Sequence, residues 1–154
     1  MGTFIIHLLS GFITTVCFGM LYDVPKKLLG PAGLAGAAGY IVYFMLLNYF
    51  KMTSFFSMTV ASFTIGFLGH IFARKLRTPV ILFTMPGIIP LVPGATAYNM
   101  MRLFIEGNTN SGIGYGTETL LVAGALALGL AMNSALFQIL TSRNLFKRGR
   151  RFLP

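Results

Sequence analysis

The chain has 154 residues, of which 55% are hydrophobic and 10% are charged, and its formal net charge is +9. A chain this short cannot bury so much apolar surface in a water-soluble globule, so the composition excludes a soluble enzyme and a disordered chain. It predicts an all-α integral membrane protein. The single cysteine, Cys17, excludes an intrachain disulfide and a cysteine-based zinc site.

The charged residues divide the chain into five windows that carry no charged side chain. These windows are 1–22, 28–50, 52–73, 78–101 and 119–142. A bilayer core of about 30 Å takes roughly 20 apolar residues in helix, so each window is long enough to cross once. We expect transmembrane helices near 3–22, 30–50, 54–73, 79–104 and 118–141. They would form a five-helix membrane domain over 1–142, followed by a basic cytoplasmic tail over 143–154.

The basic residues predict how the chain is oriented. Ten of the twelve lie in the first loop, the third loop and the tail, whereas Lys51 and Arg102 lie on the other side. Because basic loops stay in the cytoplasm, we expect the N-terminus outside the cell and the C-terminus inside. We expect the basic tail to fix the topology. The alternative is that it binds anionic lipid headgroups. No binding module accompanies the charge, so nucleic acid is not expected.

The fourth window is interrupted by proline and glycine. Pro86, Pro90 and Pro93 fall in its middle, and Gly87 and Gly94 follow two of them. Proline removes a backbone donor and clashes with the carbonyl four residues back, so three within eight residues should stop a regular helix. Non-helical backbone at bilayer depth is tolerated only inside protein or beside a watery cavity. We expect two half-helices around an unwound centre, or a re-entrant turn.

A broken helix of this kind is typical of transporter binding sites. The second half-helix would begin near Gly94, and its N-terminal N–H groups and dipole would suit a substrate carboxylate. The alternative is a kink that only shapes packing. The segment supplies the candidate substrate-binding residues Pro86, Gly87, Pro90, Pro93, Gly94, Thr96 and Asn99.

Two windows carry rows of small residues, which predict close helix packing. The second window holds Gly30, Gly33, Gly36 and Gly39, and the fifth holds Ala123, Ala127, Ala131 and Ala135. The rows do not say whether the packing partner is internal, a second copy or another protein.

Ionisable groups near or within membrane helices are candidates for proton coupling. Here they are His7, His70, Asp23 and Glu118, of which the last three are kept as candidates. The favoured alternative is structural: the two acids are interfacial, and His70 snorkels beside Arg74. We expect Glu118 to open the fifth helix, where a carboxylate complements the helix dipole. The polar Asn133 is expected to hydrogen-bond between helices. No nucleophile–base pair, HExxH, P-loop or dinucleotide turn is present, so we expect no enzyme, no cofactor and no metal site.

The run Met85-Pro86-Gly87-Ile88-Ile89-Pro90-Leu91-Val92-Pro93-Gly94, followed by Tyr98, resembles the C-terminal membrane half of the threonine/serine exporter (ThrE) family. The upstream run 21–25, with Leu28, Gly33 and Gly36 after it, is similar to the family's first loop and second helix. In many bacteria this half is a separate small protein, as in the YjjB-like branch. The chain departs from the pattern at Asp23, where a neutral polar residue is expected.

The resemblance implies a membrane subunit of a two-component secondary exporter. Its partner would be a YjjP-like subunit that carries the N-terminal exporter half, and the two halves would form a 5+5 inverted repeat. The implied substrates are threonine, serine or succinate. The alternatives are a non-transporting membrane scaffold, which has little need of a helix broken in mid-membrane, and a homo-oligomeric channel.

Overall fold

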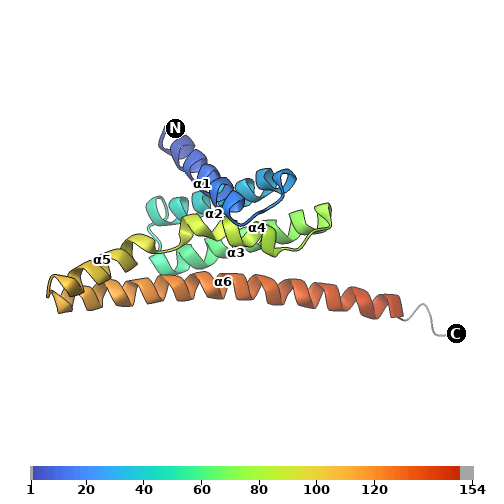
Figure 1. Ribbon diagram of the computed structural model, residues 1–154. Coiled ribbons are helices and arrows are strands. Elements are labelled where there is room, and N and C mark those ends of the chain that lie inside the picture. The colour runs from blue at the N-terminus through green and yellow to red at the C-terminus, as the bar shows by residue number, and fades with distance from the viewer. Residues whose placement is uncertain (1, 150–154) are drawn as a thin grey trace.

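The protein was analysed as a computed structural model that describes the backbone of residues 2–149 and the side chains of residues 4–140. Within these bounds the chain is all-helical and contains no strand, which confirms the predicted fold class (Figure 1). The elements are α1 (Gly2–Leu21), α2 (Lys26–Asn48), α3 (Ser54–Leu76), α4 (Ile81–Ile88), the short 3-10 helix η1 (Ile89–Leu91), α5 (Gly94–Ile105) and α6 (Thr109–Gly149).

Four described helices, α1, α2, α3 and α6, are long and apolar enough to cross a membrane. A fifth crossing arises if α4, η1 and α5 are counted as one bent span. In Figure 1 α4 begins beside the end of α3, and α5 continues toward the opposite end of the molecule. The fourth segment therefore runs across the body and does not turn back on itself.

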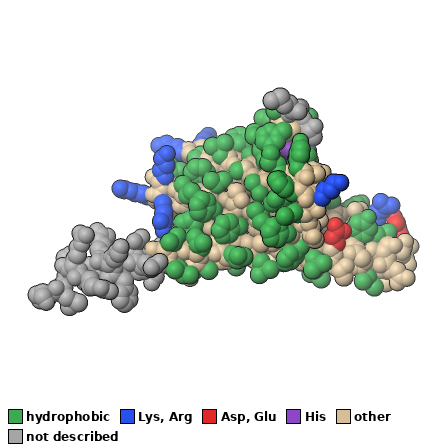
Figure 2. Space-filling model, turned by 180° about the vertical axis from the view of Figure 1, so that it is seen from behind, with side chains coloured by type: hydrophobic (Ala, Val, Ile, Leu, Met, Phe, Trp, Pro, Cys, Tyr) green, Lys and Arg blue, Asp and Glu red, His purple; other side chains and the backbone are tan. Residues whose placement is uncertain are grey.

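The helices α1 to α4 form the body of the molecule, and α6 lies along α3 (Figure 1). Helix α5 and the first part of α6 form an arm that projects from the body. Figure 2 shows Lys and Arg side chains gathered at one end, where the α1–α2 and α3–α4 connections lie. The acidic side chains visible in that view lie toward the other end. This uneven charge is the pattern on which the predicted orientation depends.

Three glycines of the α2 row, Gly33, Gly36 and Gly39, are buried within the chain, whereas Gly30 is exposed. A Cβ on Gly36 would collide with Thr15 of α1, and a Cβ on Gly87 of α4 would come within 3.7 Å of the Gly36 backbone nitrogen. On α6 the small residues Ala125 and Gly129 are buried against α3. The alanine row from Ala123 to Ala135 is exposed on the described surface.

The predicted break in the fourth segment is present, but not every proline in it interrupts the helix. Helix α4 continues through Pro86, whose ring is fully buried, so one lost backbone hydrogen bond is offset by packing. The break comes at Val92, which is extended (φ −62°, ψ 129°) because a residue before proline is disfavoured in helix. The axes on either side differ by 50°. Helix α5 then begins at Gly94, as predicted.

The fifth predicted helix begins nine residues earlier than expected, at Thr109 instead of 118. Gly112 and Gly116 let α6 pack closely against α5, and they do not interrupt the helix. A Cβ on Gly112 would lie 3.1 Å from the Phe104 ring, and one on Gly116 would lie 3.0 Å from Met100 Sδ. At its other end the backbone of α6 continues to Gly149. The side chains of the expected tail, 143–154, lie outside the described residues.

Candidate functional site

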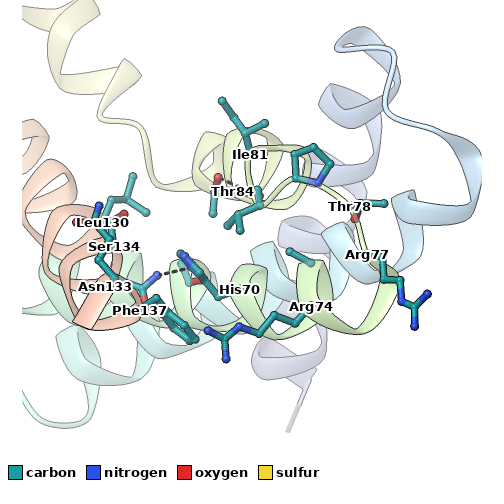
Figure 3. A pocket seen from close by; sticks show the side chains of 15 residues that line it. His70, Arg74, Arg77, Thr78, Ile81, Thr84, Leu130, Asn133, Ser134 and Phe137 are labelled. Carbon is teal, nitrogen blue, oxygen red and sulfur yellow. Dashed lines mark hydrogen bonds between the residues drawn. The ribbon is translucent and has the colours of Figure 1, made fainter. Parts of the chain in front are cut away.

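A pocket of about 910 Å³ opens where α3, α4 and α6 meet (Figure 3). This volume is in the range of sites that hold small molecules. Helix α3 contributes Gly66, His70, Ala73 and Arg74; the connection to α4 contributes Arg77, Thr78, Pro79 and Val80; α4 contributes Ile81 and Thr84; and α6 contributes Leu130, Asn133, Ser134, Phe137 and Gln138.

Asn133 forms the polar inner wall of the pocket. Gly66 makes room for it, because a Cβ at that position would collide with the Asn133 amide. The Asn133 side chain is 1% exposed, and its Nδ2 lies 3.2 Å from Nδ1 of His70 (Figure 3). The predicted interhelical hydrogen bond of Asn133 is therefore present, between α6 and α3. Asn133 Oδ1 is buried and has no hydrogen-bond partner within the described chain.

The His70 ring has a preferred tautomer in this setting. Its Nδ1 lies 3.0 Å from the Gly66 carbonyl oxygen as well as near Asn133, and one nitrogen cannot donate to the first and accept from the second at once. The Gly66 carbonyl already receives the helical N–H of residue 70. The tautomer in which Nδ1 accepts a hydrogen bond from the Asn133 amide gives the largest number of these groups a partner. In this tautomer Nε2 carries the hydrogen and is a donor.

Phe137 contacts two polar side chains of α3 through its ring. The His70 ring stacks on Phe137 with centroids 4.0 Å apart and planes inclined by 10°. The Arg74 guanidinium carbon lies 5.1 Å from the centroid of the same ring. Arg74 follows His70 by one helical turn, so both project from the same side of α3. Phe137 itself is 8% exposed, which makes it a fixed platform.

The pocket has a positive character. Among the described residues, its lining holds Arg74 and Arg77 and no acidic side chain. Arg77 ends α3 in the left-handed conformation (φ 54°, ψ 44°), where glycine is the usual residue. Thr78 Oγ1, next in the chain, is buried with no hydrogen-bond partner within the described residues. Charge and unsatisfied polar atoms thus meet at one end of the membrane body.

The seven candidate substrate-binding residues do not come together in this pocket. Pro86 and Gly87 are buried on the side of α4 that faces α1 and α2. A Cβ on Gly19 of α1 would lie 3.8 Å from Pro86, and a Cβ on Gly87 would lie 3.7 Å from the backbone nitrogen of Gly36 in α2. Pro90 lies in η1, and Pro93 precedes α5.

The remaining three candidates lie on the arm formed by α5. Gly94 is exposed, and nothing lies within 4 Å of a Cβ built on it. The Thr96 hydroxyl donates to the Pro93 carbonyl oxygen at 3.0 Å, so that donor is engaged by the backbone. Asn99 is half-buried on the same helix.

Of the three ionisable candidates, His70 alone lines the pocket. Asp23 is exposed in the α1–α2 turn with a positive φ of 53°. Glu118 is exposed and does not open α6, which starts at Thr109, so the expected complement to the helix dipole is wrong.

Sequence reasoning missed Arg74, Phe137 and Asn133 as members of one site. Two signals were present: Arg74 stands four residues after His70, and Asn133 interrupts an apolar helix. Neither signal shows that α3 and α6 pack side by side, so the cluster appears only in three dimensions.

Comparison with known proteins agrees with this architecture. The family model of the threonine/serine exporter ThrE matches residues 7–136. An uncharacterised protein of Haemophilus influenzae is 32% identical over 139 residues, which cover 84% of this chain and 46% of that protein. The chain thus spans about half the length of the curated relative it matches. No solved structure matches. Since the family model covers most of the helical body, this multi-pass membrane protein belongs to the threonine/serine exporter family.

Proposed function

We propose that the chain is the membrane subunit of a two-component secondary exporter of small carboxylate-bearing metabolites, namely threonine, serine or succinate. Family membership carries this proposal, since the matched segment includes the body and the bend between α4 and α5. A bent span that lines a pocket is a common plan for transporters, in which substrate sites lie at discontinuous helices. Export, and not chemical conversion, is the activity that this plan supports.

The partner in this proposal is a YjjP-like subunit that supplies the other exporter half. The length of the Haemophilus influenzae relative supports it, because this chain matches 46% of that protein and leaves about half unmatched. Five crossings with the N-terminus outside, joined to five of the opposite orientation, would make an inverted repeat.

The proposed location is the bacterial cytoplasmic membrane, with the basic end inside. The gathering of Lys and Arg at the α1–α2 and α3–α4 connections supports this orientation (Figure 2). The pocket between α3, α4 and α6 would then face the cytoplasm, where substrate for export is found. An ion gradient would drive transport, with His70 as the proposed proton-coupling residue and Asp23 and Glu118 as weaker candidates.

In this proposal the substrate enters the pocket from the cytoplasm and then passes the bend between α4 and α5. Thr84 of the pocket and Gly94 of the arm belong to one segment on either side of it. Movement at Val92–Pro93 would change how α4 and α5 are related. Pro86, Gly87 and Pro90 would act through the shape of the bend, and Thr96 and Asn99 would meet substrate on its outer side.

Reconstitution in liposomes tests the proposal. Vesicles would be loaded with labelled threonine, serine or succinate and prepared with this chain, with the partner, or with both. We expect efflux from vesicles that hold both proteins and none above leak from either alone. Full-rate efflux with this chain alone would contradict the two-component proposal, and no efflux of any of the three compounds with both present would contradict the exporter.

A further inference from the structure

We propose that the pocket between α3, α4 and α6 is the carboxylate-binding site, with Arg74 as the residue that pairs with the carboxylate. This inference rests on the proposed export function and names the site at which the substrate is held. The His70–Asn133 pair forms a polar wall next to Arg74, and Arg77 adds positive charge at the rim.

The position of Arg74 suits a planar anion. A guanidinium that stacks on an aromatic ring uses its face for the contact, while its N–H groups point outward in its own plane. A carboxylate binds in that plane, with two parallel hydrogen bonds. Because the ring of Phe137 holds the Arg74 guanidinium carbon 5.1 Å from its centroid, less side-chain freedom is lost on binding.

The inner wall suits an uncharged or cationic polar group. Asn133 is 1% exposed, and its Oδ1 has no hydrogen-bond partner within the described residues. A buried acceptor without a donor is costly, and rotation of the Asn133 amide toward the pocket would let a ligand hydroxyl or ammonium satisfy it. With Nδ1 accepting from Asn133, the Nε2–H of His70 offers a donor on the same wall.

The charge and size of the pocket narrow the ligand class. None of the described lining residues is acidic, so an anion meets no repulsion from them, and apolar side chains such as Leu130 and Ile81 complete the lining. A short carbon chain that carries a carboxylate and a second polar group fits this description. Phosphate shares the charge but not the apolar part, and it is therefore the competing anion in the test.

Protection of an introduced thiol tests the site. Ser134 lines the pocket, so Ser134→Cys would be made in a Cys17→Ala background, which removes the sole native cysteine. The full chain with its partner, in membranes broken so that both faces are accessible, would be treated with a water-soluble thiol reagent. The competitors would be L-threonine, succinate, their amides L-threoninamide and succinamide, which lack the carboxylate charge, and inorganic phosphate. Lys75→Cys is the control, since Lys75 is exposed at the same end but does not line the pocket.

We expect L-threonine or succinate to slow labelling of Ser134→Cys about tenfold at saturation, and the corresponding amide to have little effect. The Lys75→Cys control should label equally with and without competitor. Adding Arg74→Gln should raise the concentration of carboxylate needed for protection by about tenfold or more, the scale of one charge-assisted hydrogen bond. Arg74→Lys should retain part of the protection.

Three results would overturn the inference: equal protection by acid and amide, equal protection by phosphate, or protection that Arg74→Gln leaves unchanged. The outcome is separable from that of the export assay. If liposomes export carboxylates while Ser134→Cys is never protected, export stands and the site lies elsewhere. If protection follows the carboxylate while no efflux occurs, the binding site stands and export fails.

Discussion

Phe137 illustrates how one residue can organise a site without contacting a ligand. Its ring stacks on His70 of α3 and lies against the Arg74 guanidinium one turn further on. Both contacts are aromatic in origin, so an aliphatic side chain of similar volume would fill the space and lose the alignment.

Phe137→Leu should therefore lower the free energy of unfolding modestly, by about 1–2 kcal/mol, and raise KM for export severalfold. The reason for the KM effect is that Arg74 would sample more orientations before it pairs with a carboxylate. Thermal unfolding and initial efflux rates measure the two effects. Phe56→Leu, at an exposed position of α3, should change neither. An unchanged KM in a stable Phe137→Leu protein would show that the platform does not position Arg74.

Arg77 occupies a backbone position that favours glycine. Its φ of 54° costs an L-residue about 1 kcal/mol, so Arg77→Gly should stabilise the end of α3 by up to that amount. The same change removes positive charge from the rim of the pocket and should raise KM.

Lys51→Gly is the matched control for Arg77→Gly. Lys51 also has a positive φ, of 47°, and lies in the connection at the other end of α2 and α3. The Lys51→Gly protein should gain a similar amount of stability, and its KM for export should be unchanged. If Arg77→Gly also leaves KM unchanged, the arginine serves topology and not binding.

At the scale of elements, the bend between α4 and α5 gives a clear test because its glycines differ in surroundings. Gly94 has open space around it, whereas a Cβ on Gly87 would lie 2.9 Å from Ile65 and close to Gly36. Gly94→Leu should therefore insert and fold normally but impair export, because substrate or partner would meet the new side chain. Gly87→Leu should impair folding itself.

The measurement is initial export rate divided by inserted protein. Leu128→Phe, on an exposed face of α6, should leave the rate unchanged. A normal rate for a normally folded Gly94→Leu protein would mean that the bend only shapes packing and that the arm takes no part in the route.

The sequence predicted the helices well where charged residues mark their ends. It predicted them poorly where contacts with other helices determine where a helix begins or bends. Charge-free windows indicate crossings because buried charge is costly in lipid, and four of the five windows became continuous helices. The same logic cannot show that the Pro86 ring is buried between helices, or that Gly112 and Gly116 hold α6 close to α5. Those outcomes depend on neighbours distant in sequence.

The pocket was beyond sequence reasoning for the same reason. His70 was a candidate, yet its partners Asn133 and Phe137 are more than 60 positions away along the chain. Proline and glycine indicated the bend because their effect on the backbone is local and can be predicted from the sequence. The packing of α3 against α6 cannot be predicted in this way.

At the scale of the whole molecule, the distribution of charge predicts a topology. A reporter fused after residue 154 should be active as a cytoplasmic reporter, since the α1–α2 and α3–α4 connections carry the basic residues. A reporter in the connection at Lys51 should give the periplasmic signal. The reverse pattern would place the pocket outside the cell and contradict both the orientation and the inverted repeat.

The central claim is that carboxylates leave the cell through the pocket between α3, α4 and α6. The most direct test is the initial efflux rate from liposomes that hold the partner with Arg74→Gln, Arg74→Lys or Lys75→Gln. Lys75→Gln removes a neighbouring charge that does not line the pocket and should keep the normal rate. Arg74→Gln should lower the rate at limiting substrate by about tenfold or more, and Arg74→Lys should recover part of it. An Arg74→Gln complex that assembles normally and exports at the full rate would contradict the claim.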